Sequence, residues 1–317
     1  MKVHSPSRTA KMPMCDTEHS TSRTRRERCR SELNQGTDRV LNRREPKEYW
    51  GNKQTKKGEK SVRVSFVNIN GIGPWAKSEK SEDIRKYMDT AKVDVMGISE
   101  VGVNWSKVHN VHTIWERTKR WFHTRRISVS YNTTEVISGR LQQGGTATIV
   151  TNEVAHRVKT TGFDESGLGR WSWVLVSGKQ GCVTRMVTVY CPTKSCGPST
   201  VYTQQLTHLK VDPISRFWDD LAKDIHKWQA QGEQLIISGD WNEEVAGPNL
   251  TRWMGLFSLR EAVTYTHGSN PPPTYHRGTH AIDGIFVSHT IQISKAGYLP
   301  FNDLPGDHRG IWVDIPT

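Results

Sequence analysis

The chain has 317 residues and a formal net charge of +12, and 34% of its residues are hydrophobic. Its length and its 12 tryptophans allow one large folded domain or two small ones. No apolar run approaches the roughly 20 residues of a membrane-spanning helix, and the first 16 residues lack a secretory signal. We therefore expect an intracellular protein without a membrane partner. The five cysteines show neither the spacing of a metal site nor that of a disulfide framework.

Most of the positive charge lies near the N-terminus. Residues 1–60 contain 16 Lys and Arg against 8 Asp and Glu, a net charge of +8, and the remaining residues carry only +4. This stretch is polar, so we expect a disordered basic tail over 1–60 and a folded domain over 61–317. The arginine-rich segment 23–30 is typical of a nuclear-localisation or nucleic-acid-binding patch, which favours a nuclear location. A merely solvated tail has the same composition.

Hydrophobic periodicity predicts a mixed succession of strands and helices. In chain order the expected elements are strand 62–69, helix 81–92, strand 93–99, helix 108–122, strands 127–131, 145–150, 171–178 and 185–190, helix 213–231, strand 235–238, helix 249–263, and strands 281–288 and 310–315. Strands outnumber helices and come in consecutive runs. This order predicts an α/β domain of two β-sheets with helices packed outside.

Polar residues stand where several apolar strands stop. Asp240 and Asn242 follow one of them, and we expect both side chains on the same side of the strand, because side chains alternate. The other residues of this kind are Asn68 and Asn70, Glu100, Tyr190, Asp283 inside an apolar run, and the pair Asp307 and His308 before the last strand.

This set suggests metal-assisted hydrolysis of a phosphodiester. A hard cation such as Mg²⁺ prefers oxygen ligands and keeps several waters, so one or two carboxylates suffice, and Glu100 is the best-placed ligand. His308 would serve as acid, base or charge stabiliser if a carboxylate orients its ring. Asp283 is the natural partner, because an unpaired carboxylate in an apolar strand is costly.

Each residue also has a purely structural interpretation. Gly-Asp-x-Asn is commonly a turn with a local side-chain hydrogen bond, and Asp-His before a strand is commonly a loop. Glu100 could cap a helix or be exposed, Asp283 could satisfy a backbone group, and Tyr190 could serve packing. The basic, aromatic stretch 115–126 could touch nucleic acid, but its periodicity favours a helix with Trp115 and Phe122 in the core.

Residues 61–317 resemble the endonuclease/exonuclease/phosphatase family, which includes DNase I, apurinic endonucleases and LINE-type retrotransposon endonucleases. The resemblance rests on the ordered set above, and "NINGIG" and "GISE" are similar to the retrotransposon branch. It implies a four-layer α/β sandwich of two packed, mainly antiparallel sheets. The site would lie at the top of the sheets, with Mg²⁺ as cofactor and Mn²⁺ as a substitute.

The resemblance also implies a role for each residue. Glu100 would ligate the metal, Asn68 would help to place it, and Asp307 would be a second metal-side carboxylate. Asn70 would sit beside Asn68. Tyr190 and Asn242 would contact the phosphate, Asp240 would orient or activate the attacking water, and Asp283 and His308 would form a dyad.

We therefore expect a Mg²⁺-dependent endonuclease that nicks DNA and leaves a 3′-hydroxyl, as a retrotransposon enzyme does, with DNA as partner. Two departures from the family pattern are Trp241, where many members have phenylalanine, and "VGVNW" after Glu100, which speaks against abasic-site specificity. We expect Trp241 to point away from the site. The alternatives are an apurinic endonuclease, an RNA 3′ exonuclease, a phosphoinositide phosphatase, and a non-catalytic relic that binds nucleic acid.

Overall fold

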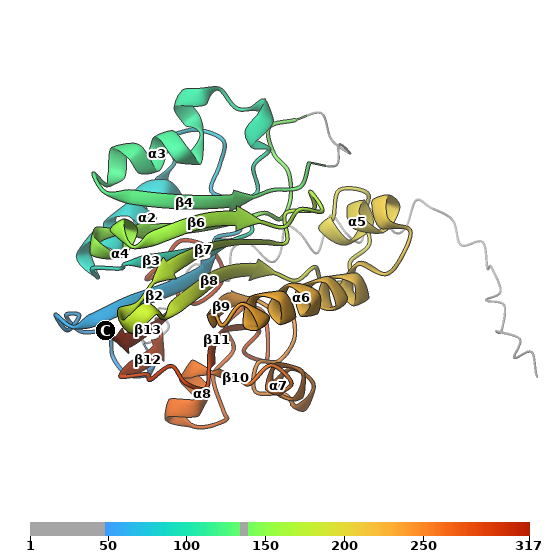
Figure 1. The fold of residues 1–317 in the computed structure, drawn as a ribbon. Coiled ribbons are helices and arrows are strands. Elements are labelled where there is room, and N and C mark those ends of the chain that lie inside the picture. The colour runs from blue at the N-terminus through green and yellow to red at the C-terminus, as the bar shows by residue number, and fades with distance from the viewer. Residues whose placement is uncertain (1–47, 134–138) are drawn as a thin grey trace, which may run out of the picture. The chain divides into compact units, whose positions relative to one another are not determined.

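The computed structural model describes residues 48–133 and 139–317. Two β-sheets form its centre, with helices on both outer sides (Figure 1). In the first sheet the strand order is β1 (Trp50–Gly51), β12 (Lys295–Tyr298), β13 (Ile311–Pro316), β2 (Ser61–Asn68), β3 (Val95–Ser99), β5 (Thr146–Thr151) and β4 (Arg125–Ser130). In the second it is β10 (Leu259–Glu261), β11 (Asp283–Ser288), β9 (Gln234–Asp240), β8 (Val183–Tyr190), β7 (Trp171–Ser177) and β6 (Val158–Phe163).

The helices of the described chain are short except for one. They are α2 (Glu79–Thr90), α3 (Ile114–Trp121), α4 (Asn152–His156), α5 (Val201–Leu209), α6 (Pro213–Ala230), α7 (Pro248–Gly255) and α8 (Ala262–His267). Single 3₁₀ turns lie at Trp105–Lys107, Asn110–His112 and Lys179–Gly181. No helix in the described ranges has the length and apolar character needed to cross a membrane.

The two sheets pack face to face, which confirms the expected α/β sandwich. An inner apolar layer joins residues of both sheets, such as Phe66 and Ile285. A second layer joins the first sheet to α2 and α3, and a third joins the second sheet to α6 and α7. Close approach of the sheets requires a glycine in β3, because a Cβ at Gly97 would lie 2.7 Å from the Thr188 hydroxyl. Sheets, helices and the layers between them thus form the four-layer architecture.

Each sheet contains one parallel pair of strands at its centre, and all its other pairs are antiparallel. These pairs are β2 with β3 and β8 with β9. The carboxyl ends of parallel neighbours meet at one edge of a sheet, where open α/β sheets place their ligands. Asn68 and Ser99 end one pair, and Tyr190 and Asp240 end the other. The fold therefore gathers the polar strand ends that the sequence singled out.

Helix α6 shows how local sequence produces these layers. Asp212 caps its N-terminus by accepting a hydrogen bond from the Ser215 amide at 3.1 Å, and Pro213 occupies the first turn. The buried residues Phe217, Leu221, Ile225 and Trp228 recur at helical spacing. This apolar stripe packs the helix on the outer face of the second sheet.

Some expected elements differ from those observed. The helix expected over 249–263 is divided into α7, β10 and α8, because Leu259–Glu261 pairs with β11 as an edge strand. The helix expected over 108–122 is a 3₁₀ turn followed by α3. Trp115 is 40% exposed on α3, so its expected core position is wrong.

The N-terminal boundary also differs from the expectation. Trp50 in β1 pairs with Tyr298 and packs on the inner core. The folded unit therefore includes residues 48–60, which the boundary expected at residue 60 assigns to the tail. The rest of the expected tail, including the arginine-rich segment 23–30, lies outside the described residues.

Candidate active site

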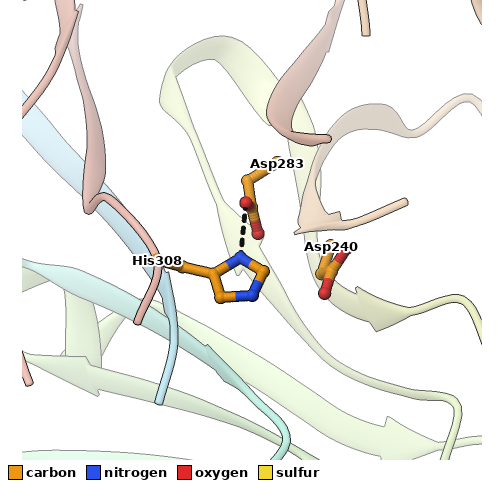
Figure 2. A group of neighbouring side chains, drawn as sticks. All are labelled: Asp240, Asp283 and His308. Carbon is orange, nitrogen blue, oxygen red and sulfur yellow. Dashed lines mark hydrogen bonds and ion pairs between the residues drawn. The ribbon is translucent and has the colours of Figure 1, made fainter. Parts of the chain in front are cut away.

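Asp240, Asp283 and His308 form a buried cluster at the carboxyl end of β9 (Figure 2). The antiparallel register of β9 and β11 places Asp240 opposite Asp283. His308 comes from the loop before β13, and its Nδ1 lies 2.7 Å from Asp283 Oδ2. One potential ligand atom from each of the three side chains lies within 4.8 Å of the others. The hydrogen bond to Asp283 fixes the ring orientation and leaves Nε2 free on the side toward Asp240.

The charges in this cluster favour an imidazolium. Burial opposes the charged form of His308, but the negative charge and hydrogen bond of Asp283, helped by Asp240 and Asp307, raise its pKa to about 10. An imidazolium has no lone pair for a metal, so His308 fits a role in charge stabilisation or proton donation. Burial and the neighbouring Asp283 raise the pKa of Asp240 well above its usual value, although His308 and Asn68 act against this. A carboxylate with a raised pKa accepts a proton more readily near neutral pH.

Two strand ends carry the same local motif and are joined to each other. The backbone N–H of Asn70 donates to Asn68 Oδ1 at 3.0 Å, and the backbone N–H of Asn242 donates to Asp240 Oδ1, also at 3.0 Å. Across the two sheets, Asn68 Nδ2 donates to Asp240 Oδ2 at 2.8 Å. Both oxygens of Asp240 are therefore held in fixed directions.

These turns require unusual backbone conformations. Asn70, Glu100 and Asn242 all have left-handed φ values, of 46°, 48° and 47°. Asparagine tolerates this region, whereas glutamate adopts it rarely, so Glu100 carries the larger strain. Simple strand alternation does not explain the placement of Asn242, because β9 ends at Asp240 and the chain turns. Instead, Asn242 is turned back so that its Nδ2 donates to the Cys191 carbonyl at 2.7 Å.

Glu100, Tyr190 and Asn70 line a cavity of about 570 Å³ beside the cluster. Burial raises the pKa of Tyr190 well above its usual value, and the charges of Glu100 and Asp240 add to this, so the phenol stays protonated. Asn70 Nδ2 lies 3.3 Å from Asp307 Oδ2. Every residue proposed from the sequence is thus near the same end of the sandwich.

The donor set fits a hard cation on the side of Glu100 and Asp307. Asp307 Oδ1 is buried and has no hydrogen-bond partner in the described chain. A carboxylate oxygen in this state is poorly satisfied unless a cation or water contacts it. Glu100 and Asp307 supply oxygen ligands of the kind that Mg²⁺ or Mn²⁺ prefers, and Asn68 holds Asp240 beside them.

Several neighbouring residues were not expected from the sequence. Lys80 of α2 donates to the carbonyls of Ile69 and Asn70, both at 2.7 Å, and its charge interacts with Asp307 and Glu100. Burial lowers the pKa of Lys80, and the two acids partly compensate. A lysine immediately before the expected helix gives no signal of this role.

The loop before β11 supports the dyad from the other side. The Thr274 hydroxyl accepts from the amides of Ile282 and Asp283 at 2.9 and 3.1 Å. The ring of Tyr275 lies 5.0 Å from that of His308, centroid to centroid. At Gly306 φ is 121° and a Cβ would lie 2.6 Å from the Asn68 carbonyl, so only glycine lets the Asp307–His308 segment approach β2.

Trp241 packs away from the cluster, as expected. It is fully buried, its ring stacks on Trp218 with an interplanar angle of 12°, and its Nε1 donates to the Gly284 carbonyl at 3.3 Å. These contacts belong to the layer between the second sheet and α6. Trp241 therefore contributes to packing and does not belong to the cluster.

Comparison with known proteins agrees with this geometry. The model of the Endonuclease/Exonuclease/phosphatase family matches residues 66–308. The chain belongs to this family. The match begins in β2 and ends at His308, so it contains the whole candidate site. The hydrolases of this family typically depend on divalent metals, and the site contains carboxylates that could hold one. No match was found among curated proteins.

Solved structures of several family enzymes share the fold. An AP endonuclease from Leishmania major is 14% identical with a TM-score of 0.61, covering 81% of this chain and 88% of the other. The human Nocturnin catalytic domain is 14% identical with a TM-score of 0.59, covering 85% and 97%. A 3′ phosphatase from Neisseria bound to a product DNA hairpin is 14% identical with a TM-score of 0.55, covering 81% and 100%. At this identity the likeness establishes the architecture of the family.

Proposed function

We propose that the protein is a Mg²⁺-dependent endonuclease that hydrolyses a phosphodiester bond of DNA and leaves a 3′-hydroxyl, in the manner of retrotransposon endonucleases. The observation that carries this proposal is the buried group of Asp240, Asp283 and His308, with Asp240 held by Asn68 from the opposite sheet. Such a group combines a proton acceptor with a fixed positive charge, and both are needed to attack a phosphodiester.

In this proposal the residues divide the reaction between them. Asp240 accepts the proton of the attacking water. The His308 imidazolium, oriented by Asp283, stabilises charge on the phosphate, and Asn242 and Tyr190 hold its oxygens by hydrogen bonds. Glu100 and Asp307, with Asn68, would hold the metal. The metal would offset the negative charge of the phosphate and the charge that develops on the leaving oxygen.

DNA is the proposed substrate for two reasons. The related structures include an AP endonuclease and a 3′ phosphatase with a DNA hairpin product, and the motifs "NINGIG" and "GISE" are similar to the retrotransposon branch. The apolar side chains of the segment after Glu100 pack in the core, because Val101, Val103 and Trp105 are all buried. It therefore offers no new side chains for an abasic site, and we expect little preference for one.

A substrate panel tests the proposal. Purified full-length protein would receive supercoiled plasmid, an abasic oligonucleotide, polyadenylated RNA and an inositol phosphate at equal Mg²⁺ concentrations. We expect nicked plasmid whose ends a DNA polymerase extends without prior treatment, because extension requires a 3′-hydroxyl. Turnover restricted to RNA or to the inositol phosphate would overturn the DNA assignment, and cleavage of the abasic strand alone would indicate a repair enzyme.

Two further parts of the proposal concern the tail. The net charge of +6 on residues 1–47 supports a contribution to DNA binding through counterion release. The arginine-rich segment 23–30 supports nuclear import. Both are tested by truncation, the first by the salt dependence of binding and the second by the location of a fluorescent fusion with and without the segment.

A further inference from the structure

Trp75 is a large aromatic residue on the surface close to the site. Its side chain is 51% exposed, although tryptophan is usually much more buried. It lies between β2 and α2, four residues beyond Gly71, which lines the cavity beside Glu100. An indole left in solvent close along the chain to this cavity is a candidate contact for a ligand that enters it.

Two neighbouring side chains contact this indole. The ring of His112 meets it edge to face, with centroids 5.3 Å apart and an interplanar angle of 86°. The guanidinium carbon of Arg140 lies 4.7 Å from the centre of the indole ring. Arg140 is itself exposed, so the indole and the guanidinium over it form an aromatic and cationic surface that is open to solvent.

This surface continues the wall of the cavity. The backbone N–H of Asn104 donates to the Arg140 carbonyl at 2.9 Å, and the backbone N–H of Gln142 donates to the Gly102 carbonyl at 3.2 Å. The strip around Arg140 is thereby paired with the segment that follows Glu100. Leu141, next along the chain, is 61% exposed and lines the cavity together with Glu100.

A buried arginine fixes the surface from beneath. Arg117 is 1% exposed, and it donates to the Gly73 carbonyl at 2.8 Å, to the Ser81 hydroxyl at 2.9 Å and to the His112 carbonyl at 2.8 Å. Burial lowers its pKa to about 10, and the nearby Arg120 adds to this. The chain thus buries a costly cation to join the segments that carry Trp75 and His112.

We propose that Trp75 and Arg140 form a stacking subsite for one unpaired nucleobase of the DNA strand that is cut. This inference rests on the proposed function. A strand with its scissile phosphate at Asp240 and His308 would follow the cavity wall past Glu100 and Leu141 and reach this surface. Aromatic rings and guanidinium planes both stack on bases without selecting a sequence. Arg140 also attracts the neighbouring phosphate.

The test measures coupling between Trp75 and individual bases. Fluorescein-labelled duplexes, each lacking one base at a successive position near the cut, would be bound to the full-length protein in EDTA, which prevents cleavage. For wild type we expect one position where base removal weakens binding on the order of 10-fold, the factor for losing one stack. Trp75→Ala should bind the intact duplex about as weakly, and base removal at that position should cost it little more.

Two variants serve as controls. Trp75→Phe keeps an aromatic face and should restore most of the affinity. Tyr265→Ala removes another exposed aromatic residue, 61% exposed and with the Arg260 guanidinium 3.7 Å from its ring centre, but located on α8. It should leave binding and the base scan unchanged. With Mg²⁺, Trp75→Ala should raise KM for plasmid nicking and leave kcat nearly constant.

The outcomes separate the two proposals. If wild type nicks plasmid but Trp75→Ala and Tyr265→Ala behave alike, or if no position couples to Trp75, the subsite is wrong and the nuclease assignment stands. If wild type neither binds nor nicks DNA, both fail. A thermal unfolding curve for each variant identifies loss of folding. If Trp75→Ala does not fold, Trp75→Leu replaces it, because leucine keeps apolar bulk without a ring. Trp75→Leu must then lose the dependence of binding on the single base position, as expected for Trp75→Ala.

Discussion

Replacing Asp283 with asparagine should change the pH dependence of catalysis more than it changes the fold. Asp283 is fully buried and His308 is 7% exposed, and the 2.7 Å hydrogen bond between them is part of why the imidazole is charged. The rise of the His308 pKa from 6.5 to about 10 corresponds to roughly 5 kcal/mol in favour of the imidazolium, at about 1.4 kcal/mol per pH unit.

Asparagine keeps the shape of the side chain but removes the charge. Burial then acts against the imidazolium with less compensation, and the pKa of His308 falls toward or below its ordinary value of about 6.5. At about pH 7.5 no more than roughly one tenth of the molecules would then be protonated. Together with the loss of ring orientation, the expected decrease in kcat/KM is on the order of 10²- to 10⁴-fold.

The assay is the initial rate of plasmid nicking in Mg²⁺ as a function of pH. On the alkaline side of the profile we expect the wild-type rate to fall only as the pH approaches about 10, and the Asp283→Asn rate to have fallen already near neutral pH. Asp219→Asn, a change of an exposed carboxylate on α6, is the control. An Asp283→Asn enzyme with the wild-type rate and pH profile would refute the dyad and make Asp283 a structural residue.

The same pair affects the pH dependence of stability. The folded-state pKa of His308 lies above its unfolded value, so its contribution to the free energy of unfolding is fully present below about pH 6.5 and is lost as the pH rises toward about 10. Urea unfolding of wild type should show this loss across that window. Asp283→Asn should show a smaller slope there, and an equal slope would mean that another group titrates.

Three other variants extend the account. Glu100→Gln should reduce nicking on the order of 10²-fold or more with little change in folding, because it removes a ligand charge from a sparse metal site. Glu153→Gln, an exposed control on α4, should have no effect. Near-normal nicking by Glu100→Gln at low Mg²⁺ would exclude Glu100 as a metal ligand. Trp241→Phe should cost roughly 1–2 kcal/mol in unfolding free energy, through a lost hydrogen bond and lost volume, while kcat stays constant; a large loss of kcat would contradict its packing role. Removal of residues 1–47, which carry a net charge of +6, should weaken DNA binding and flatten its salt dependence without reducing kcat at saturating DNA, and an unchanged salt slope would show that this segment does not touch DNA.

Much of the site could be predicted because its residues interrupt apolar strands. Asp283 stands in the run "AIDGIFV", where an isolated carboxylate demands a partner, and His308 follows another acid just before the last strand. Their hydrogen bond needs only the two strands to be close. The sandwich architecture followed in the same way, from the number and order of apolar runs.

Other features depend on packing that a linear pattern does not contain. The bond between Asn68 and Asp240 exists because β2 and β9 end at the same level in different sheets. The support by Lys80 depends on the position of α2 on the first sheet. Leu259–Glu261 interrupts an otherwise helical pattern because an edge of the second sheet was free to pair with it. In each case tertiary contacts decided between local alternatives.

The most direct test of the central claim compares wild type with Asp240→Asn on supercoiled plasmid. Asparagine at this position keeps the size of the side chain but removes the group that accepts the proton of the attacking water. With Mg²⁺, wild type should convert supercoiled plasmid to the nicked form, and EDTA should abolish this. Asp240→Asn should be on the order of 10³-fold slower or worse. Equal rates for the two proteins, or wild-type nicking that persists in EDTA, would contradict a metal-dependent phosphodiesterase built on Asp240.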